Sequence, residues 1–352
     1  MQTHQIAIIP GDGIGKEVIP ASLEVLDVLA AKCSFQLKYQ HYDYSCEHFK
    51  KTGAMMPEDG LERLRDSDSI FLGAVGFPGV PDHVSLWGLL IPIRRGFQQY
   101  VNLRPVRLLQ GVASPLRTPG DIDFYIVREN NEGEYSSIGG RLYEGTEREL
   151  AVQESVFTKV GVDKVMKFAF ELAQRRNKKL TSATKSNGII HTMPYWDERF
   201  AAMGSHYPEV ARDQFHIDIL AAHFVQRPES FDVVVASNLF GDILSDLGPA
   251  VVGGMGIAPG ANINPEKEYP SMFEPVHGSA PDIAGQGIAN PIACFWTAKM
   301  MLDHLGEIEA ANLLMRAIEQ LTKKGKVLTR DLGGTASTKD VTAEIIRILT
   351  IA

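Results

Sequence analysis

Short apolar runs followed by stretches of helical spacing recur along this chain. Near the N-terminus, an apolar run at residues 5–9 leads into the glycine-rich segment GDGIG at residues 11–15. Apolar residues then recur at helical spacing from Ile14 to Leu29. The pattern predicts a strand, a tight turn and a helix, with Pro20 near the first turns because a proline deeper inside would kink the helix.

Three further runs predict strands that are buried on both faces. Residues 69–75, 124–127 and 231–236 are apolar with little alternation, which is typical of parallel strands covered by helices. Helical spacing occurs at residues 162–175 and 238–247, and the pattern is mostly helical from residue 291 onward. This alternation of element types predicts the α/β class.

Glycine and proline cluster at residues 248–260 and 277–291, where we expect long loops that carry function. The length of 352 residues favours about two domains. Since the sequence has no internal repeat and no flexible linker, we expect these domains to be interwoven.

The GDGIG segment does not match the fingerprint of a standard Rossmann dinucleotide site. That fingerprint is Gly-x-Gly-x-x-Gly, whereas Gly11, Gly13 and Gly15 are spaced two apart and Lys16 occupies the third glycine position. No clear strand ending in an acidic residue follows about 20 residues later. We therefore interpret the segment as a tight strand-to-helix turn that borders a ligand at most.

Two carboxylates stand out in the segment NLFGDILSDLG. Asp242 and Asp246 are four residues apart and share one face of the predicted helix, where like charges repel. A solvated acidic face is the common outcome for such a pair. Here the surrounding residues are mostly apolar, so we favour a divalent cation between the two, and oxygen ligands suit Mg²⁺ or Mn²⁺ rather than zinc.

Arginine is the second chemical signal. Arg94, Arg104 and Arg128 can each bind a carboxylate through two parallel hydrogen bonds, although any single arginine is commonly a surface charge. Arg128 is the most informative because it directly follows a predicted buried strand. Tyr135 and Lys185 can act as general acid and base when their pKa values are shifted, but their spacing alone does not select them.

Composition excludes several classes of function. The 35 basic and 43 acidic residues give a net charge of −8, which argues against a general nucleic-acid binder. Three cysteines without a Cys-x-x-Cys pair favour a reducing compartment and no structural zinc site. We expect neither a secretory signal nor a membrane-spanning segment, and therefore a cytoplasmic protein.

Five segments occur together and in order, namely NLRPV, RENNEGEYSS, TKSNG, NLFGDILSDL and EPVHGSAPDIAGQGIANPIA. Together they resemble the β-decarboxylating dehydrogenases, the isocitrate/isopropylmalate dehydrogenase family, over nearly the whole chain. The segments SLWGLLIPIRR, QQYVNLRPVRL and HTMPYWDER are similar to the tartrate/D-malate branch of that family. The resemblance implies two interwoven α/β domains in an isocitrate/isopropylmalate dehydrogenase-like fold, which is not a standard Rossmann fold.

The resemblance also implies a domain division and a set of site residues. Residues 1–101 and 252–352 would form a large cofactor-binding domain, and residues 102–251 an inserted small domain with the dimer interface and the metal and catalytic residues. The substrate carboxylates would be bound by Arg94, Arg104 and Arg128, and Mg²⁺ or Mn²⁺ by Asp218, Asp242 and Asp246. Lys185 would be the base for the substrate hydroxyl and Tyr135 the proton donor after CO₂ leaves. Lys185 and Asp218 would reach in from the neighbouring subunit of a homodimer.

For the cofactor, the resemblance implies the loop at residues 277–290 rather than the N-terminal glycines. The matching positions are Asn187, Glu274, His277, Gly278, Ser279, Ala280, Asp282, Ile283 and Asn290. A carboxylate at Asp282 can accept hydrogen bonds from both ribose hydroxyls and repels a 2′-phosphate, so NAD is favoured over NADP. NADP-using relatives have Lys and Tyr in place of Asp282 and Ile283. The resemblance further implies a monovalent cation such as K⁺, for which the sequence has no motif.

Two departures from the family pattern bear on the substrate. Asn131 stands where the family usually has Thr, and we expect little loss from this change. Residues 87–91 (WGLLI) are apolar where isocitrate enzymes have a serine, and an apolar wall disfavours a third carboxylate. We therefore predict oxidation and β-decarboxylation of a small 2-hydroxy diacid, tartrate or D-malate. The alternatives are 3-isopropylmalate as substrate, or a silent binding protein with the same fold.

Overall fold

The computed structural model describes residues 2–351 and contains strands, α-helices and one π-helical turn at Leu86–Leu90. The strands are β1 Thr3–Gly11, β2 Gln36–His41, β3 Ser69–Ala74, β4 Val101–Arg107, β5 Asp123–Glu129, β6 Gly139–Leu142, β7 Leu150–Gln153, β8 Lys179–Thr184, β9 Ala211–His216, β10 Val233–Ala236, β11 Pro259–Ile263 and β12 Ser271–Pro275. The helices are α1 Gly15–Cys33, α2 Cys46–Thr52, α3 Gly60–Arg65, α4 Asp82–Ser85, α5 Ile91–Gly96, α6 Lys159–Arg175, α7 Thr192–Gly204, α8 Ile217–Gln226, α9 Asn238–Val251, α10 Ile292–Leu305, α11 Ile308–Lys324 and α12 Thr338–Ile351.

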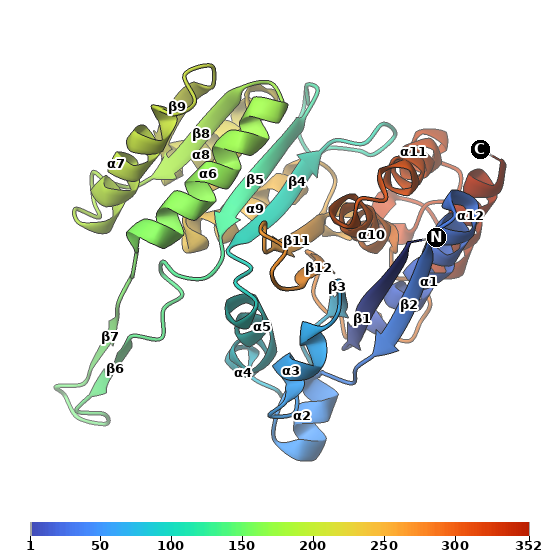
Figure 1. Ribbon diagram of the computed structural model, residues 1–352, viewed down its shortest axis with the longest axis horizontal. Helices are drawn as coiled ribbons and strands as arrows, with labels where there is room; N and C mark the ends of the chain where they lie inside the picture. The colour runs from blue at the N-terminus through green and yellow to red at the C-terminus, as the bar shows by residue number, and fades with distance from the viewer. Residues whose placement is uncertain (1, 352) are drawn as a thin grey trace.

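One mixed ten-stranded sheet runs through the protein in the order β2-β1-β3-β12-β11-β4-β5-β10-β8-β9 (Figure 1). The pairs β2–β1, β1–β3 and β3–β12 are parallel, and so are β5–β10, β10–β8 and β8–β9. Three antiparallel pairs, β12–β11, β11–β4 and β4–β5, join the two parallel halves. The carboxyl ends of β5, β10, β8 and β9 therefore lie along one edge, where ligands usually bind in open α/β sheets.

Helices cover both faces of the sheet, as the buried apolar strands predict. In Figure 1, α6 lies on one face of β5, β10 and β8, while α8 and α9 lie on the other. All residues of β3 and β10 are buried, because these strands are central and packed between helices. The strands predicted at residues 5–9, 69–75, 124–127 and 231–236 and the predicted helices are confirmed, and the α/β class with them.

One prediction from the glycine and proline pattern is wrong. Residues 248–260 are not one loop, because α9 continues to Val251 with Pro249 in its last turn and β11 begins at Pro259. A strand, β2, follows the first helix and pairs in parallel with β1, but it ends at His41 and not at an acidic residue, so it does not complete the Rossmann fingerprint. Its residues are mostly exposed at the edge of the sheet, so no apolar run marks it.

The chain segments mix within this sheet. Strands from residues 3–74 and 259–275 form one half, and strands from residues 101–236 form the other. Because the sheet is continuous, the division into domains at residues 101/102 and 251/252 stays a prediction. None of the helices described in residues 2–351 is long and apolar enough to span a membrane.

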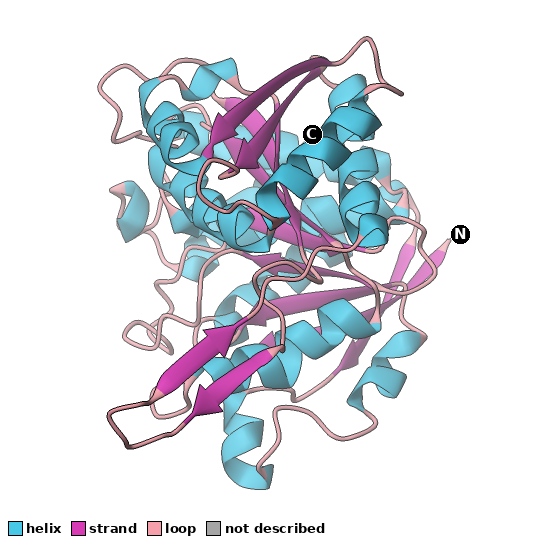
Figure 2. Ribbon diagram, turned by 90° about the vertical axis from the view of Figure 1, so that its left-hand side faces the viewer, coloured by secondary structure: helices cyan, strands magenta, loops and turns pink. Residues whose placement is uncertain are grey.

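A hairpin projects from the half that carries β5. Strands β6 and β7 pair only with each other and extend away from the body of the protein, as Figures 1 and 2 show. All eight of their residues are exposed. An isolated two-stranded hairpin is only marginally stable in water, so this segment is suited to pack against another surface.

Candidate active site

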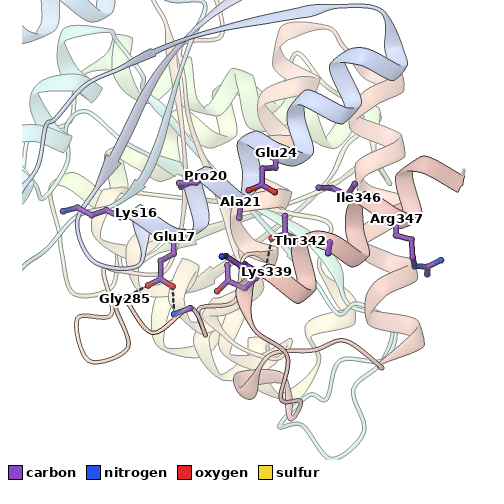
Figure 3. Close-up of a pocket in the computed structure, with 13 residues that line it drawn as sticks. Lys16, Glu17, Pro20, Ala21, Glu24, Gly285, Lys339, Thr342, Ile346 and Arg347 are labelled. Atoms are coloured by element: carbon purple, nitrogen blue, oxygen red, sulfur yellow. Dashed lines mark hydrogen bonds between the residues drawn. The ribbon is translucent and has the colours of Figure 1, made fainter.

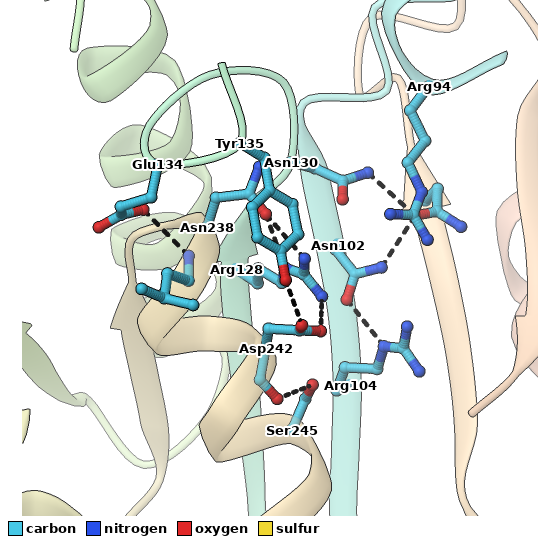
Figure 4. A network of polar contacts seen from close by, with 12 residues as sticks. Arg94, Asn102, Arg104, Arg128, Asn130, Glu134, Tyr135, Asn238, Asp242 and Ser245 are labelled. Atoms are coloured by element: carbon cyan, nitrogen blue, oxygen red, sulfur yellow. Dashed lines mark hydrogen bonds and ion pairs between the residues drawn. The ribbon is translucent and has the colours of Figure 1, made fainter. Parts of the chain in front are cut away.

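Three arginines from three different elements meet where β4 and β5 lie beside α9. Arg128 is the second-last residue of β5, Arg104 lies on β4, and Arg94 lies on α5 (Figure 4). All three are buried, with 2–7% of their surface exposed. The structure thus brings together the three arginines that the sequence analysis selected for carboxylate binding.

Arg128 is fixed by the first turn of α9. Its Nη1 donates a short hydrogen bond to Asp242, and its Nε and Nη2 donate to Asn238 Oδ1 at 3.1 and 2.7 Å. Gly241 makes this approach possible, because a Cβ there would lie 2.5 Å from Arg128 Cγ. The glycine inside the segment NLFGDIL is therefore required by the packing of α9 against the arginine stem.

A buried carboxylate holds Arg94 and a buried amide holds Arg104. Arg94 Nη2 donates to Glu274 Oε1 at 2.9 Å, and Arg104 Nε donates to Asn102 Oδ1 at 2.7 Å. Asn262 connects the two pairs, since it accepts from Asn102 Nδ2 and donates to Glu274 Oε1, both at 2.8 Å. The network fixes the guanidinium groups before any ligand binds.

Of the three arginines, Arg94 and Arg128 each form an ion pair with a carboxylate among the described residues, whereas Arg104 forms none. Burial, together with the neighbouring Arg128 and Arg94, lowers the pKa of Arg104 to about 10, and burial also lowers the pKa of Arg128. Two buried nitrogens, Arg94 Nε and Arg104 Nη1, have no hydrogen-bond partner within residues 2–351. Incompletely paired buried guanidinium groups favour an anion nearby.

Tyr135 lies over this cluster and contacts the first of the two paired carboxylates. Its hydroxyl donates to Asp242 Oδ2 at 2.6 Å, and its ring lies 5.4 Å from the Arg128 guanidinium carbon. Burial, and then the Asp242 charge, raise the pKa of Tyr135 to about 12. At neutral pH the tyrosine therefore keeps its proton and can donate it.

Asp242 and Asp246 share one face of α9, as their spacing predicts. The pKa of Asp242 is lowered because Arg128 and the Tyr135 hydroxyl outweigh its burial. The pKa of Asp246 is raised by burial and by repulsion from Asp242. This imbalance would be relieved by a cation between the two carboxylates.

Lys185 and Asp218 form a separate pair. Lys185 follows β8 and donates to Asp218 Oδ1 of α8 at 2.6 Å, which lowers the pKa of that carboxyl. Asn187 lies exposed in the turn after Lys185. Within residues 2–351, no three His, Cys, Asp or Glu side chains are placed to hold one metal ion, so Asp218 does not join Asp242 and Asp246 in a single chain.

The loop between β12 and α10 has no regular structure over residues 277–290, as its composition predicts. Gly13 supports it from the GDGIG turn, because Ile14 N donates to Ser279 O at 2.9 Å and a Cβ on Gly13 would lie 2.0 Å from that oxygen. Glu17 accepts from Gly285 N and Gly287 N at 2.6 and 2.9 Å. The N-terminal turn thus holds the loop.

The predicted cofactor positions lie on this loop and on the strand before it. Asn290 Nδ2 donates to Asp331 Oδ2 at 2.8 Å, which orients the amide, while the buried His277 Nε2 has no partner within residues 2–351. The exposed Asp282 carboxylate makes no hydrogen bond or ion pair with any described residue. Glu274 differs from these, because it is engaged with Arg94 inside the arginine cluster.

Comparisons with known proteins decide the family. The family model for isocitrate/isopropylmalate dehydrogenase matches residues 5–345. The chain belongs to the isocitrate/isopropylmalate dehydrogenase family. It is 58% identical to the D-malate dehydrogenase (decarboxylating) of Escherichia coli strain K12, over 99% of both chains. It is 55% identical to the tartrate dehydrogenase/decarboxylase of Pseudomonas putida, over 97% of both.

A solved structure of the same family shares the fold. The isocitrate dehydrogenase of Methylococcus capsulatus is similar with a TM-score of 0.88 and 31% identity, over 98% of this chain and 99% of that one. The prediction of an isocitrate/isopropylmalate dehydrogenase-like fold is confirmed by this likeness and by the family match.

Several residues that build the site were not predicted from the sequence. Asn102, Asn130 and Asn262 form the amide network, and Asn130 lies inside one of the recognised segments. Glu134 accepts from Ser237 Oγ at 2.7 Å and from Leu239 N at 3.0 Å, and so caps the start of α9. Polar residues on buried strands are the signal that could have found the asparagines.

A cavity of about 840 Å³ lies away from this cluster, between α1 and α12 (Figure 3). Its wall includes Glu17, Gly285 and Gly287, so it borders the rear of the loop that Glu17 holds. None of the predicted cofactor or substrate residues lines it. We therefore do not assign the substrate or cofactor to this cavity.

Proposed function

We propose that this protein catalyses the NAD-dependent and divalent-metal-dependent oxidation and β-decarboxylation of tartrate or D-malate. The observation that carries the proposal is the buried arginine cluster with Tyr135 and Asp242 over it. Two relatives reported above, which are 58% and 55% identical to this chain, are named as dehydrogenases of D-malate and of tartrate, and this supports the same substrate class here.

The arginines would bind and orient the two carboxylates of the diacid. Their positions are fixed by Glu274, Asn102 and Asn238, so little reorganisation is needed when substrate binds. The π-helical turn before α5 presents Trp87, which is 38% exposed, whereas Leu89 is fully buried. An apolar group at Trp87 disfavours a third carboxylate, as isocitrate has, because that charge would lose water without a partner.

The carboxylates fit a divalent cation. Asp242 and Asp246 from one chain would hold Mg²⁺ or Mn²⁺ with Asp218 from a second subunit, because Asp218 does not reach them in its own chain. Such an ion supplies charge stabilisation at the substrate hydroxyl oxygen.

The loop residues fit NAD. The free Asp282 carboxylate suits two ribose hydroxyls and repels a 2′-phosphate, while the orphaned His277 Nε2 and the oriented Asn290 amide offer further polar contacts. When bound there, NAD would supply the hydride acceptor for the substrate carbon. Ile283 would contribute an apolar contact from the same loop.

Two side chains would move protons. Lys185 Nζ of a second subunit would take the proton of the substrate hydroxyl, and Tyr135 Oη would give one to the carbon that loses CO₂. Within one chain Lys185 is paired with Asp218 instead. Bringing both groups to the arginine cluster of another chain would complete the site.

A homodimer supplies that arrangement. Ile219 and Val225 of α8 and Ile243 of α9 are about half exposed, and these two helices lie in contact beside the Lys185–Asp218 pair. The projecting hairpin adds Leu142, which is 57% exposed. Exposed apolar patches of this kind mark protein interfaces. The three cysteines are free, which fits a reducing, cytoplasmic compartment.

The substrate test is a panel of D-malate, tartrate, 3-isopropylmalate and isocitrate with NAD and Mn²⁺, in which NADH and CO₂ are both measured. We expect D-malate or tartrate to give the highest kcat/KM. A much higher kcat/KM for 3-isopropylmalate would reassign the substrate. Absence of NADH with every acid would favour a silent binding protein.

The dimer test is the Ile243→Asp variant, followed by sedimentation. Ile308→Asp is its matched control, because Ile308 is exposed to nearly the same extent, 51% against 50%, but lies on α11. We expect wild type and the control to sediment as dimers and Ile243→Asp to shift toward monomers. A dimer of unchanged stability in Ile243→Asp would contradict this interface.

A further inference from the structure

Arg95 contacts the loop that carries Tyr135, although it is not part of the arginine cluster. It lies on α5 next to Arg94 and points to the loop after β5. Its Nη2 donates to Tyr135 O at 2.6 Å and its Nε donates to Asn131 O at 3.3 Å. One guanidinium group thus holds two backbone carbonyls of the same loop.

The guanidinium group of Arg95 contacts an aromatic ring and backbone carbonyls instead of a carboxylate. No carboxylate among the described residues forms an ion pair with it, whereas Arg94 and Arg128 each have one. Instead its guanidinium carbon lies 5.2 Å from the centre of the Trp87 ring. A guanidinium group stacks favourably on an indole, and its planar fork suits two acceptors better than an ammonium group does.

The π-helical turn brings Trp87 to this position. Leu86–Leu90 forms the turn and α5 follows directly at Ile91, so Trp87 and Arg95 belong to one continuous helical segment. Such π-helical insertions often occur at functional sites. The segment therefore carries Arg94 into the cluster and presents Arg95, stacked on Trp87, to the loop.

Asn131 strengthens the same junction. Its side-chain amide lies 3.2 Å from Asn130 O and 3.3 Å from Arg94 O, distances at which the NH₂ group donates to both carbonyls. Its backbone N donates to Glu129 Oε1 at 2.7 Å. The loop is thus tied to α5 through the side chain and the carbonyl of Asn131. A threonine, which is shorter and has a single donor, cannot make both side-chain contacts.

Tyr135 is consequently held at both ends. Its hydroxyl is fixed by Asp242 at 2.6 Å, and its backbone carbonyl is fixed by Arg95 at the same distance. A shift of about 1 Å in a reacting group can lower a rate by ~10²-fold. Loss of the backbone contact would let the ring move relative to the arginine cluster without removing any group that touches substrate.

We propose that Arg95 is a positioning residue for Tyr135, and that Trp87 sets the orientation of Arg95, so that the π-helical segment and the proton-donating loop act as one unit. This inference rests on the proposed function, because it assigns Arg95 to the step in which Tyr135 gives up its proton.

The test compares Arg95→Ala, Arg95→Lys and a control variant, Arg176→Ala, with wild type. Arg176 shares two kinds of contact with Arg95, since it lies 4.6 Å from the Tyr125 ring and donates to Asp123 O at 3.0 Å, although it also forms ion pairs with Asp123 and Asp232. Its contacts lie outside the arginine cluster and the Tyr135 loop. For each variant we measure kcat, KM for D-malate or tartrate, whichever wild type turns over, and the CO₂ released for each NADH formed.

We expect Arg95→Ala to lower kcat about tenfold or more with little change in KM. We also expect fewer CO₂ per NADH, because an enolate that is protonated slowly can add CO₂ back, and the keto acid formed in this way then leaves the site. Arg95→Lys should recover only part of kcat, since an ammonium group cannot serve both carbonyls. Arg176→Ala loses the two ion pairs of Arg176 but should keep the wild-type CO₂ to NADH ratio. Equal kcat and an equal ratio in Arg95→Ala and wild type would overturn the inference.

The role of Trp87 is tested with Trp87→Leu and the double variant with Arg95→Ala. If the two residues act as one unit, the double variant should be no slower than about the slower single variant. If the two losses multiply, Trp87 does not act through Arg95. Failure of wild type to form NADH with any acid would instead refute the proposed function.

Discussion

Gly13 provides a sharp test of how the N-terminal turn supports the cofactor loop. It has a φ of +52°, and a Cβ there would lie 2.0 Å from Ser279 O. Since real Cβ contacts stay beyond 3.0 Å, the Gly13→Ala variant must move the loop or the turn by at least 1.0 Å, the difference between these two values. A displacement of this size at residues 279–283 would misplace the groups that we assign to NAD.

The matched control is Gly53→Ala. Gly53 has a φ of +84° and no atom within 4 Å of an added Cβ, so this variant carries the left-handed backbone cost of about 1–2 kcal/mol without a clash. Both variants should lose stability in urea unfolding. Only Gly13→Ala should raise KM for NAD, by about tenfold, which corresponds to ~1.4 kcal/mol of lost binding. A KM for NAD within twofold of the control would refute the supporting role of the turn.

Two further predictions follow from charged groups near the site. Burial raises the pKa of Glu129 to about 7 from 4.5, so its stabilising contribution is complete below pH 4.5 and is lost as pH rises through about 7. At about 1.4 kcal/mol per pH unit, the free energy of unfolding of the wild type should fall by ~3 kcal/mol as the pH rises from 4.5 through about 7, whereas that of Glu129→Gln should not show this fall. Urea unfolding at pH 4.5 and 8 would measure the difference, and an equal pH dependence in the two proteins would contradict it. The pKa of Asp246 is likewise raised, by burial and by repulsion from Asp242. Asp246→Asn should therefore stabilise the metal-free protein slightly at pH 7, as thermal unfolding with a chelator would show, and should weaken Mn²⁺ binding, as calorimetry would show. An unchanged affinity for Mn²⁺ would remove Asp246 from the metal site.

The apolar pattern predicts the central strands well because burial dominates there. The runs that become β3, β5 and β10 are continuous, and the helical spacing from Asn238 onward becomes α9 with its two carboxylates on one face. Arg128 was selected because it follows such a run, and it lies at the centre of the cluster.

The antiparallel strands at the middle of the sheet are harder to predict. Strands β4 and β11 have the sequences VNLRPVR and PGANI, in which Asn102, Arg104 and Asn262 interrupt the apolar pattern. These polar residues are buried because they bind one another across the strands, which is a property of the fold and not of either segment alone. The polar residues that build the site are therefore the same residues that hide its strands from a prediction based on the apolar pattern.

The contact between Arg95 and the Tyr135 loop has no sequence signal of this kind. An arginine beside another arginine on a short helix is commonly a surface charge, and the acceptors are backbone carbonyls that every residue has. Only the path of the chain after β5 brings those carbonyls to α5.

The central claim is that one active site is built from two chains, and mixed dimers test it directly. Lys185→Ala and Asp242→Asn should each be nearly inactive alone. When the two variants are co-expressed and pair at random, half of the dimers are mixed, and each mixed dimer has one site with an intact Asp242 and an intact Lys185 from different chains. We predict about a quarter of wild-type activity for that mixture and none for the control pair Tyr135→Phe with Asp242→Asn, whose changes lie in the same half-site. No recovered activity in mixed dimers of the first pair would contradict the shared site.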